Sequence, residues 1–430
     1  MKRRVVITGM GIWSCIGQDL ETVTESLRQG KSGIVFDQSF IDYGLQSGLI
    51  GNVPRPDLKP LLPRNLRATM SEDAEYAYMA ARQAFEQAGI TDDYLKYNEV
   101  GIIFGNDGDA CVAVENDNIM QQEKLSLMLG PNALFRMSPS SAVINLSSAF
   151  HLRGVSMHIG ATCASASQAI GIASMYIRSG MQDMLLCGGS SIASVQASAS
   201  ADALYALSLR NDDPQRASRP FDKDRDGFVV SNGAAALVLE EYEHAKARGA
   251  NILAEVCGYG FSSNGIEEIS APSADAEYTA MKRALDDAGI TPDQVDYVNA
   301  HGTSTIQGDI EEAKALCRLF RGDGGLKNIE SIENLENLDN LEHLENLGNI
   351  ENLPPYISST KSMTGHENWM AGASEAVYSI LMMQNNFVAP NINLENVIDE
   401  AKDLNIARQT VYTPLNVVLS NSSGMGGINS

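Results

Sequence analysis

The sequence predicts an α/β fold in which buried sheets are layered with helices, arranged as two similar halves. Short apolar runs alternate with amphipathic helical patterns along the whole chain, which is typical of such layers. One pattern of helix, Ala-Gly-Ile, acidic turn and strand occurs twice. A chain of 430 residues also exceeds what one simple core usually holds, so two domains or two fused halves are expected.

The strands of the first half are predicted from short runs of Val, Ile, Leu, Met and Ala. We expect them at residues 5–8, 100–105, 155–159, 183–189 and 234–241, with a helix at 74–90. The basic and then apolar start superficially resembles a signal peptide. Glycines at positions 9, 11 and 17 interrupt its apolar stretch, so a buried first strand is the better interpretation.

The repeated pattern predicts the division of the chain. The helix AEYAYMAARQAFEQAGI and the strand EVGIIFG are matched by AEYTAMKRALDDAGI (276–290) and DYVNAHGTST (296–305). We therefore expect an N-terminal half at 1–250 and a C-terminal half at 251–430.

A low-complexity insertion is expected at 322–353 within the second half. From 327 to 353 an apolar residue stands at every third position, which suits neither the 3.6-residue period of a helix nor the period of two of a strand. A solenoid-like ridge or a partner-binding helix remains an alternative. The insertion is given no chemistry and is expected to be dispensable for folding and activity.

Composition excludes several classes of protein. The chain is 44% hydrophobic and carries a formal net charge of −23, which argues against a general nucleic-acid binder. No apolar stretch approaches the length needed to span a bilayer, so no membrane association is expected. The six cysteines are scattered without CxxC pairs, which predicts reduced thiols in a cytoplasmic protein and no zinc site.

The segment FDKDRDGF (221–228) contains the D-x-D-x-D-G opening of a calcium loop. The twelfth position of that loop should hold a bidentate Glu, but Gly233 stands there, and the flanks look like strands rather than helices. No calcium or other metal site is therefore predicted.

Cys163 lies in GATCASASQA (160–169), where a strand gives way to a helix. Helix N-terminal amides and the helix dipole are expected to lower its thiol pKa. Its small neighbours leave room for a substrate and let backbone amides approach an oxyanion, as in a nucleophile elbow. The alternative is a small core cysteine.

Two histidines stand in matching positions that suit partners of this thiol. His301 in NAHGTST and His366 in TKSMTGH each follow an apolar strand in a turn rich in Gly, Ser and Thr. A lone histidine in such a turn is usually a capping or surface residue, but a matched pair beside a candidate nucleophile favours catalysis. The other four histidines have no such setting.

An ordered set of motifs resembles the β-ketoacyl-acyl-carrier-protein synthases, elongating condensing enzymes of the thiolase-like superfamily. The set comprises VVITGMGI, GATCASASQA, RPFDKDRDGFV, NAHGTSTIQGD, STKSMTGH and NSSGMGGIN. The resemblance implies a five-layered αβαβα fold, usually as a homodimer. It also implies an acyltransferase that performs a decarboxylative Claisen condensation between an acyl-enzyme and malonyl-acyl-carrier protein in fatty-acid elongation. No cofactor is implied beyond the carrier's own phosphopantetheine.

The resemblance also assigns roles to residues. Cys163, His301 and His366 match the catalytic triad. The other matches are Lys361 and Glu375 as supporting charges, Thr303 and Thr305 for the phosphopantetheine arm, Asp309 and Glu312 as braces of the active-site loops, and Arg64 and Arg67 in part as a carrier-docking segment.

This assignment suits the chemistry. Two neutral imidazoles would donate N–H groups to the developing enolate oxygen, with Lys361 setting their electrostatics. Backbone N–H groups of Cys163 and Met425 are expected to bind the acyl-enzyme oxyanion. The intact Cys-His-His set differs from chain-starting synthases, which usually have Asn, and from chain-length factors, which lack the nucleophile.

Four positions depart from the family pattern near the acyl pocket. Ser423 and Met425 replace the two gate phenylalanines, and Trp369 and Met370 stand where small residues are usual. Chain-length preference is therefore not carried over from the resemblance. A ketosynthase of a polyene or polyketide pathway and a mainly structural subunit of a ketosynthase heterodimer remain alternatives, although the intact triad counts against the second.

Overall fold

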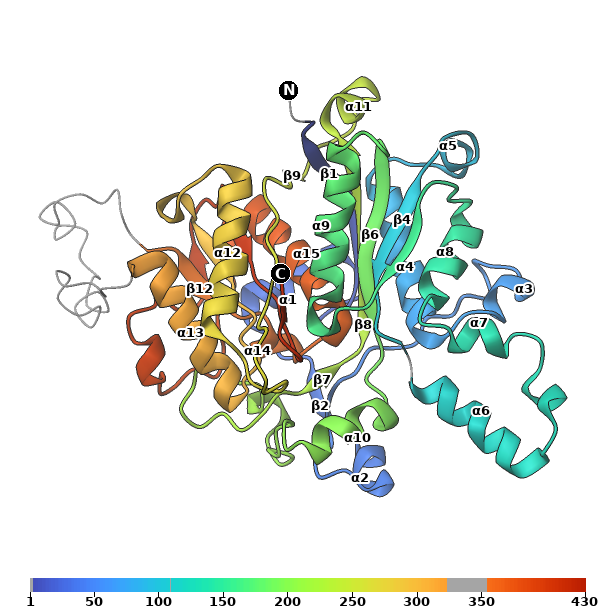
Figure 1. Ribbon diagram of the computed structural model, residues 1–430, viewed down its shortest axis with the longest axis horizontal. Helices are drawn as coiled ribbons and strands as arrows, with labels where there is room; N and C mark the ends of the chain where they lie inside the picture. The colour runs from blue at the N-terminus through green and yellow to red at the C-terminus, as the bar shows by residue number, and fades with distance from the viewer. Residues whose placement is uncertain (1–2, 109, 323–353) are drawn as a thin grey trace, which may run out of the picture.

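A computed structural model describes residues 3–108, 110–322 and 354–430 (Figure 1). The repeat predicted at 327–353 lies outside the described residues. Within the described part of the chain, no helix is both long and apolar enough to cross a bilayer.

The first half is built on a six-stranded mixed sheet. Its order is β5-β4-β6-β8-β1-β9, with β5, β4 and β6 parallel and the remaining pairs antiparallel. The strands are β1 (Val5–Trp13), β4 (Gly101–Gly105), β5 (Ser156–Ile159), β6 (Met184–Ser191), β8 (Gly233–Glu241) and β9 (Ala254–Glu255). The predicted strands are present, but β1 is longer than the expected 5–8.

Two glycines let β1 continue where the sequence analysis ended it. A Cβ atom on Gly9 would collide with the backbone carbonyl of Ala84, and one on Gly11 with that of Ala80. Both alanines belong to helix α4 (Glu72–Gln87), which packs on this sheet. The glycines therefore allow close helix-to-strand approach rather than ending the strand.

The second half repeats this contact. Gly258 and Gly260 stand two residues apart, and added Cβ atoms would collide with the carbonyls of Ala284 and Ala280 in helix α12 (Ala274–Ala288). The same glycine and alanine spacings therefore occur in both halves, as an internal duplication predicts.

Five layers result from this duplication. Helices α4 and α8 (Ser141–Phe150) cover the outer face of the first sheet. Helices α9 (Ser165–Arg178) and α15 (Ala371–Asn385) lie between it and a parallel second sheet, whose outer face is covered by α12 and α13 (Ile306–Arg321) (Figure 1). The second sheet has the order β12-β11-β15 and comprises β12 (Tyr356–Ser358), β11 (Tyr297–Asn299) and β15 (Val418–Ser420). This confirms the predicted αβαβα fold.

One hydrophobic core spans both halves. It includes Ala169 of α9, Val377 of α15 and Tyr297 of β11, all fully buried. In addition, β9 lies beyond residue 250 yet pairs with β1 of the first sheet. The halves at 1–250 and 251–430 thus share a central layer, and their exact boundary stays a prediction.

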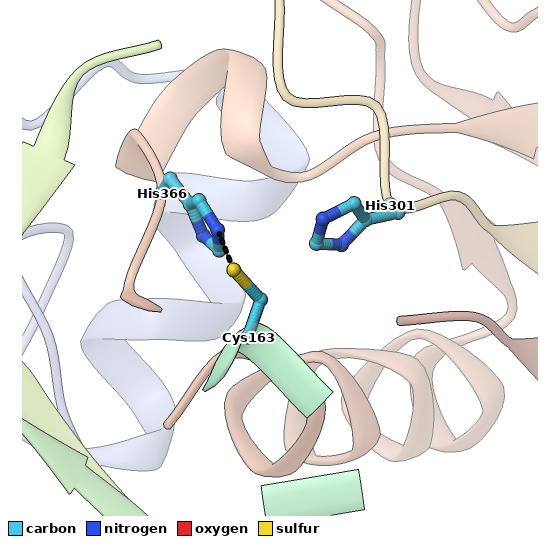
Figure 2. A group of neighbouring side chains, drawn as sticks. All are labelled: Cys163, His301 and His366. Carbon is cyan, nitrogen blue, oxygen red and sulfur yellow. Dashed lines mark hydrogen bonds between the residues drawn. The ribbon is translucent and has the colours of Figure 1, made fainter. Parts of the chain in front are cut away.

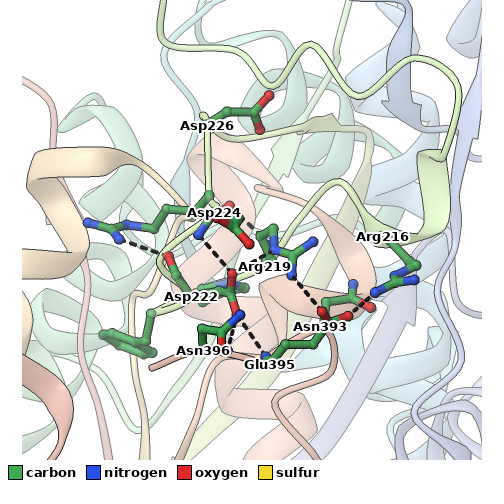
Figure 3. A network of polar contacts seen from close by, with 12 residues as sticks. Arg216, Arg219, Asp222, Asp224, Asp226, Asn393, Glu395 and Asn396 are labelled. Carbon is green, nitrogen blue, oxygen red and sulfur yellow. Dashed lines mark hydrogen bonds and ion pairs between the residues drawn. The ribbon is translucent and has the colours of Figure 1, made fainter. Parts of the chain in front are cut away.

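Asp222 of FDKDRDGF is the centre of an internal polar network (Figure 3). The fully buried Asp222 carboxylate accepts hydrogen bonds from Arg219 Nε at 3.0 Å and from the backbone N–H groups of Asp224, Glu395 and Asn396 at 2.9, 2.7 and 2.7 Å. The Asp222 carboxylate therefore stabilises the turn at 221–228 and links it to the loop at 393–396.

Candidate active site

The structure brings Cys163, His301 and His366 together (Figure 2). The Cys163 Sγ lies 3.0 Å from His366 Nε2, and the imidazole rings are 5.2 Å apart at 89°. One nitrogen or sulfur atom from each of the three residues lies within 4.8 Å of the others. Two histidines that each stand more than 100 residues after Cys163 in sequence thus converge on its thiol.

A strained turn presents the thiol. Cys163 lies in a 3₁₀ turn (Thr162–Ala164) between β5 and α9. Thr162 has a φ of 48°, which is unusual for a residue other than glycine, and its hydroxyl donates to the Met425 carbonyl at 3.1 Å. Such strain at a strand-to-helix turn is the geometry of a nucleophile elbow.

Backbone contacts position the two histidines. The Glu312 carboxylate accepts hydrogen bonds from the N–H groups of His301 and Gly302, both at 2.6 Å. The His366 N–H donates to the Val229 carbonyl at 2.6 Å, and its ring packs edge-on against Phe228. Each imidazole is therefore held through its own backbone.

Both histidines are neutral. Burial lowers the pKa of each imidazole well below its usual value, and the positive charge of Lys361 lowers it further. For His301 the neighbouring His366 adds to this effect. The Nδ1 atoms of both rings are buried without a hydrogen-bond partner among the described residues, whereas the Ser423 backbone acts on the His301 ring and the Cys163 thiol lies at His366 Nε2.

Lys361 and Glu375 form a buried ion pair behind the site. Burial raises the pKa of Glu375 to about 8, although Lys361 opposes this shift. The pair thus places one buried positive charge near both imidazoles and the thiol.

The expected lowering of the Cys163 pKa is wrong. Burial raises the pKa of this thiol and outweighs the Met425 N–H and the charge of Lys361, both of which lower it. The cysteine precedes the first residue of α9, and burial of its sulfur outweighs the effect of the helix terminus. The resting site therefore holds a neutral thiol beside a neutral imidazole.

A cleft of about 490 Å³ contains the triad; we call it the central cleft. Thr303 and Thr305 line it with their hydroxyl oxygens 2.9 Å apart. Ser423, Met425 and Trp369 also line it. The expectation that Met370 touches the acyl pocket is wrong, because this side chain is 0% exposed in the central core, packed against Gly189 and Gly233.

Asp309 holds the loop that carries the two threonines. Its carboxylate accepts hydrogen bonds from the N–H groups of Phe221 at 2.7 Å and Ser304 at 3.0 Å, and lies 3.5 Å from Arg225 Nε. Burial raises its pKa to about 7. Arg225 Nε in turn donates a hydrogen bond to the Thr305 carbonyl at 3.0 Å. The network at 219–226 therefore also holds the loop that carries Thr303 and Thr305.

Arg64 and Arg67 lie outside the central cleft. They form the short helix α3 (Arg64–Arg67) beside a surface hollow that Arg55 and Lys59 also line. Arg64 is exposed, while Arg67 Nε donates to the Leu62 carbonyl at 3.0 Å. Their role in docking stays a prediction.

One cleft residue was missed by the sequence analysis. Glu277 of α12 lines the central cleft although its side chain is 1% exposed. Its position in an ordinary amphipathic helix pattern gave no signal of this, because helix charges usually face solvent.

Comparison with known proteins agrees with this site. The family "Beta-ketoacyl synthase, N-terminal domain" matches residues 2–245, and "Beta-ketoacyl synthase, C-terminal domain" matches residues 253–333 and 342–395. The chain is 37% identical to 3-oxoacyl-[acyl-carrier-protein] synthase 1 of Escherichia coli K12, covering 100% of this chain and 98% of that protein. It is also 37% identical to the protein of that name from Haemophilus influenzae, with the same coverage.

Solved structures show the same architecture. A beta-ketoacyl synthase from Burkholderia phymatum superposes with a TM-score of 0.87 at 34% identity, covering 99% of this chain and 98% of that one. The ishigamide ketosynthase/chain length factor gives 0.85 at 29% identity, covering 100% and 98%. The chain belongs to the beta-ketoacyl synthase family and is a condensing enzyme of the acyltransferase type.

Proposed function

We propose that this enzyme elongates a carrier-bound acyl chain by decarboxylative Claisen condensation with a malonyl extender. The observation that carries this proposal is the triad itself: a thiol 3.0 Å from one neutral imidazole, with a second neutral imidazole at right angles in the same cleft. Cys163, His301 and His366 are the residues that we assign to catalysis.

The first step loads the acyl group. The Cys163 sulfur attacks the acyl thioester while His366 Nε2 receives the thiol proton and passes it to the departing pantetheine thiolate. A carbon–sulfur bond forms to Cys163, and the one to the carrier breaks. Because the resting thiol is neutral, His366 must act as the base at this step.

The second step generates the nucleophile. The bond between the malonyl methylene and its carboxylate breaks, carbon dioxide leaves, and the electron pair forms a thioester enolate. Neutral His301 donates an N–H to the enolate oxygen, which is where the negative charge develops. His366 donates as well once its ring proton has moved from Nδ1 to Nε2, a change of tautomer that the unpartnered Nδ1 leaves open. Burial and, after it, the charge of Lys361 lower the pKa of both rings and keep them unprotonated.

The third step forms the carbon–carbon bond. The enolate carbon attacks the acyl carbon on Cys163, and the oxyanion is bound by the backbone N–H groups of Cys163 and Met425. The Met425 N–H already faces the thiol. Collapse of the oxyanion releases Cys163, which takes a proton from solvent, and a 3-oxoacyl group leaves on the carrier.

The partner of this chemistry is an acyl carrier protein, whose phosphopantetheine is the only prosthetic group required. One structural neighbour is a type II PKS acyl-carrier protein in complex with its ketosynthase, 30% identical to this chain. The paired hydroxyls of Thr303 and Thr305 suit the amides of the pantetheine arm. We assign the carrier's docking surface to Arg64 and Arg67.

We propose that the enzyme is a dimer. Helix α6 (Ala110–Glu123) and its connection to α7 (Ala133–Met137) project from the body of the molecule, whereas α7 itself lies beside α8 (Figure 1). Leu127 is 81% exposed and Leu134 69%, with Leu125 and Phe135 also exposed. An apolar projection of this kind needs a covering surface, and a second copy of this chain is the occupant that we propose. A different ketosynthase chain is the alternative that a mass measurement would detect.

We place the enzyme in the cytoplasm. The thiols of Cys15, Cys163, Cys187, Cys257 and Cys317 form no disulfide within the described part of the chain, and Cys257 is exposed. Free thiols of this kind persist in a reducing compartment.

The proposal is tested by incubating the enzyme with acyl carriers of different chain length and with malonyl carrier. We expect an acyl adduct on Cys163 by intact mass and a 3-oxoacyl carrier as product. A straight-chain fatty-acyl preference would support elongation, whereas a preference for conjugated or poly-oxo chains would favour a polyene or polyketide pathway. Absence of both adduct and product would contradict the proposed reaction.

A further inference from the structure

The central cleft contains a buried carboxyl group that the mechanism above does not use. Glu277 is 1% exposed, and its Oε2 has no hydrogen-bond partner among the described residues. Both Glu277 and Ser423 line the cleft, and the Ser423 hydroxyl lies near enough to act on the Glu277 carboxyl. Buried carboxyl groups are rarely left without a close partner, so Glu277 in the wall of the cleft indicates a polar ligand.

The surroundings of Glu277 make it a hydrogen-bond donor. Burial raises the pKa of its carboxyl well above the usual value, and the nearby acidic side chains of Glu312, Glu311 and Asp309 raise it further. Among the described residues no Lys, Arg or His forms an ion pair with it. A protonated carboxyl has one O–H to donate, and the ligand should therefore offer an acceptor.

Ser423 connects this carboxyl to the reacting centre. Its backbone carbonyl acts on the His301 imidazole, whereas its side chain acts on Glu277. Glu312, which holds the His301 N–H, also lies close enough to raise the Glu277 pKa. In space, Ser423 therefore neighbours both Glu277 and His301.

We propose that Glu277 is a specificity-determining residue that donates a hydrogen bond to the carboxylate of the malonyl extender. This rests on the proposed function. One methylene separates the extender's carboxylate from the thioester carbon, so a thioester oxygen on His301 places the carboxylate in the neighbourhood of Ser423 and Glu277. An O–H donor to a carboxylate makes one of the stronger hydrogen bonds in proteins, whereas an ionised Glu277 would repel the extender.

The kinetic consequence is specific. The bond exists while the carboxylate is attached and disappears as carbon dioxide leaves. It therefore stabilises the bound extender more than the transition state, and its loss should raise KM without lowering kcat.

The test measures carbon dioxide release as a function of malonyl-carrier concentration. Glu277→Ala is expected to raise KM about tenfold or more, with kcat equal to that of the wild type or higher. Glu277→Gln keeps an N–H donor in the same shape and should stay within about threefold of the wild-type KM. The control Asp275→Ala removes a surface carboxylate two residues away on α12 and should change nothing.

Acyl transfer separates this proposal from its alternatives. Acylation of Cys163 by an acyl carrier uses the same pantetheine arm but involves no carboxylate. All three variants should therefore acylate Cys163 at the wild-type rate. An unchanged KM in Glu277→Ala would overturn the proposal. Equal losses in acylation and decarboxylation would also overturn it and would assign Glu277 to the pantetheine arm or to folding. If the wild-type enzyme releases no carbon dioxide, the proposed function itself fails, and this inference fails with it.

Discussion

Removal of the Glu312 carboxylate is expected to displace His301. This buried side chain accepts three hydrogen bonds, from the N–H groups of His301 and Gly302 at 2.6 Å each and from Asn421 Nδ2 at 2.8 Å. Glu312→Ala would leave both backbone N–H groups buried without an acceptor, and each such group costs about 1–3 kcal/mol. The expected loss of stability is therefore about 2–6 kcal/mol.

The rate of carbon dioxide release should also fall in Glu312→Ala, beyond any loss caused by unfolding. An imidazole misplaced by an ångström can cost on the order of 10²-fold in rate, so carbon dioxide release by Glu312→Ala should fall by about that factor at a temperature where the variant is folded. Glu312→Gln retains one acceptor oxygen. Its loss of stability should be roughly half that of Glu312→Ala, and its loss of rate should also be smaller.

Thermal unfolding and carbon dioxide release from malonyl carrier, measured on the same samples, check both numbers. Glu311→Gln is the matched control, because it neutralises the adjacent carboxylate of α13 while keeping an oxygen for the Ala274 N–H. If Glu312→Ala melts and decarboxylates like Glu311→Gln, the positioning role of Glu312 is wrong.

Three further outcomes are expected. Lys361→Met combined with Glu375→Gln removes the buried charge pair, so the pKa of both imidazoles should rise, although burial still lowers it. Protonated His366 cannot accept the Cys163 proton, so acylation of Cys163 should decline on acidification at a higher pH than in the wild type. Superimposable pH profiles would contradict this role of the lysine. Arg64→Glu with Arg67→Glu should raise the apparent KM for the carrier several-fold but leave acylation by a free pantetheine thioester unchanged, and an unchanged carrier KM would dismiss this docking segment. Leu127→Asp should convert the dimer to monomer in light scattering, whereas an unaltered mass would place the interface elsewhere.

Much of the fold and the triad could be predicted from sequence because their signals are local. Strands such as β4 and β6 are continuous apolar runs, as expected for strands buried on both faces. Cys163 and His301 each follow a strand in a turn of small residues, whereas the short helix α14 (Lys361–Thr364) stands between β12 and His366. The glycine and alanine spacings that pack α4 on β1 likewise occur in the sequences of both halves.

The remaining features depend on contacts between distant segments. The pKa of Cys163 is set by how completely the site is closed, so the favourable helix terminus did not decide it. Met370 and Trp369 are adjacent in sequence, yet one enters the core and the other the cleft. Glu277 lines the cleft together with Ser423, which is distant from it in sequence, and no periodicity within the helix reports this contact.

The central claim is that the thiol captures the acyl group and the histidines stabilise the enolate. The most direct measurement is carbon dioxide release from malonyl carrier by Cys163→Ala and His301→Ala, run beside intact-mass acylation of each protein. We expect Cys163→Ala to lose condensation yet still release carbon dioxide, and His301→Ala to release it roughly 10²–10³-fold more slowly while still acylating Cys163 at least in part. Carbon dioxide release at the wild-type rate by His301→Ala would contradict the account.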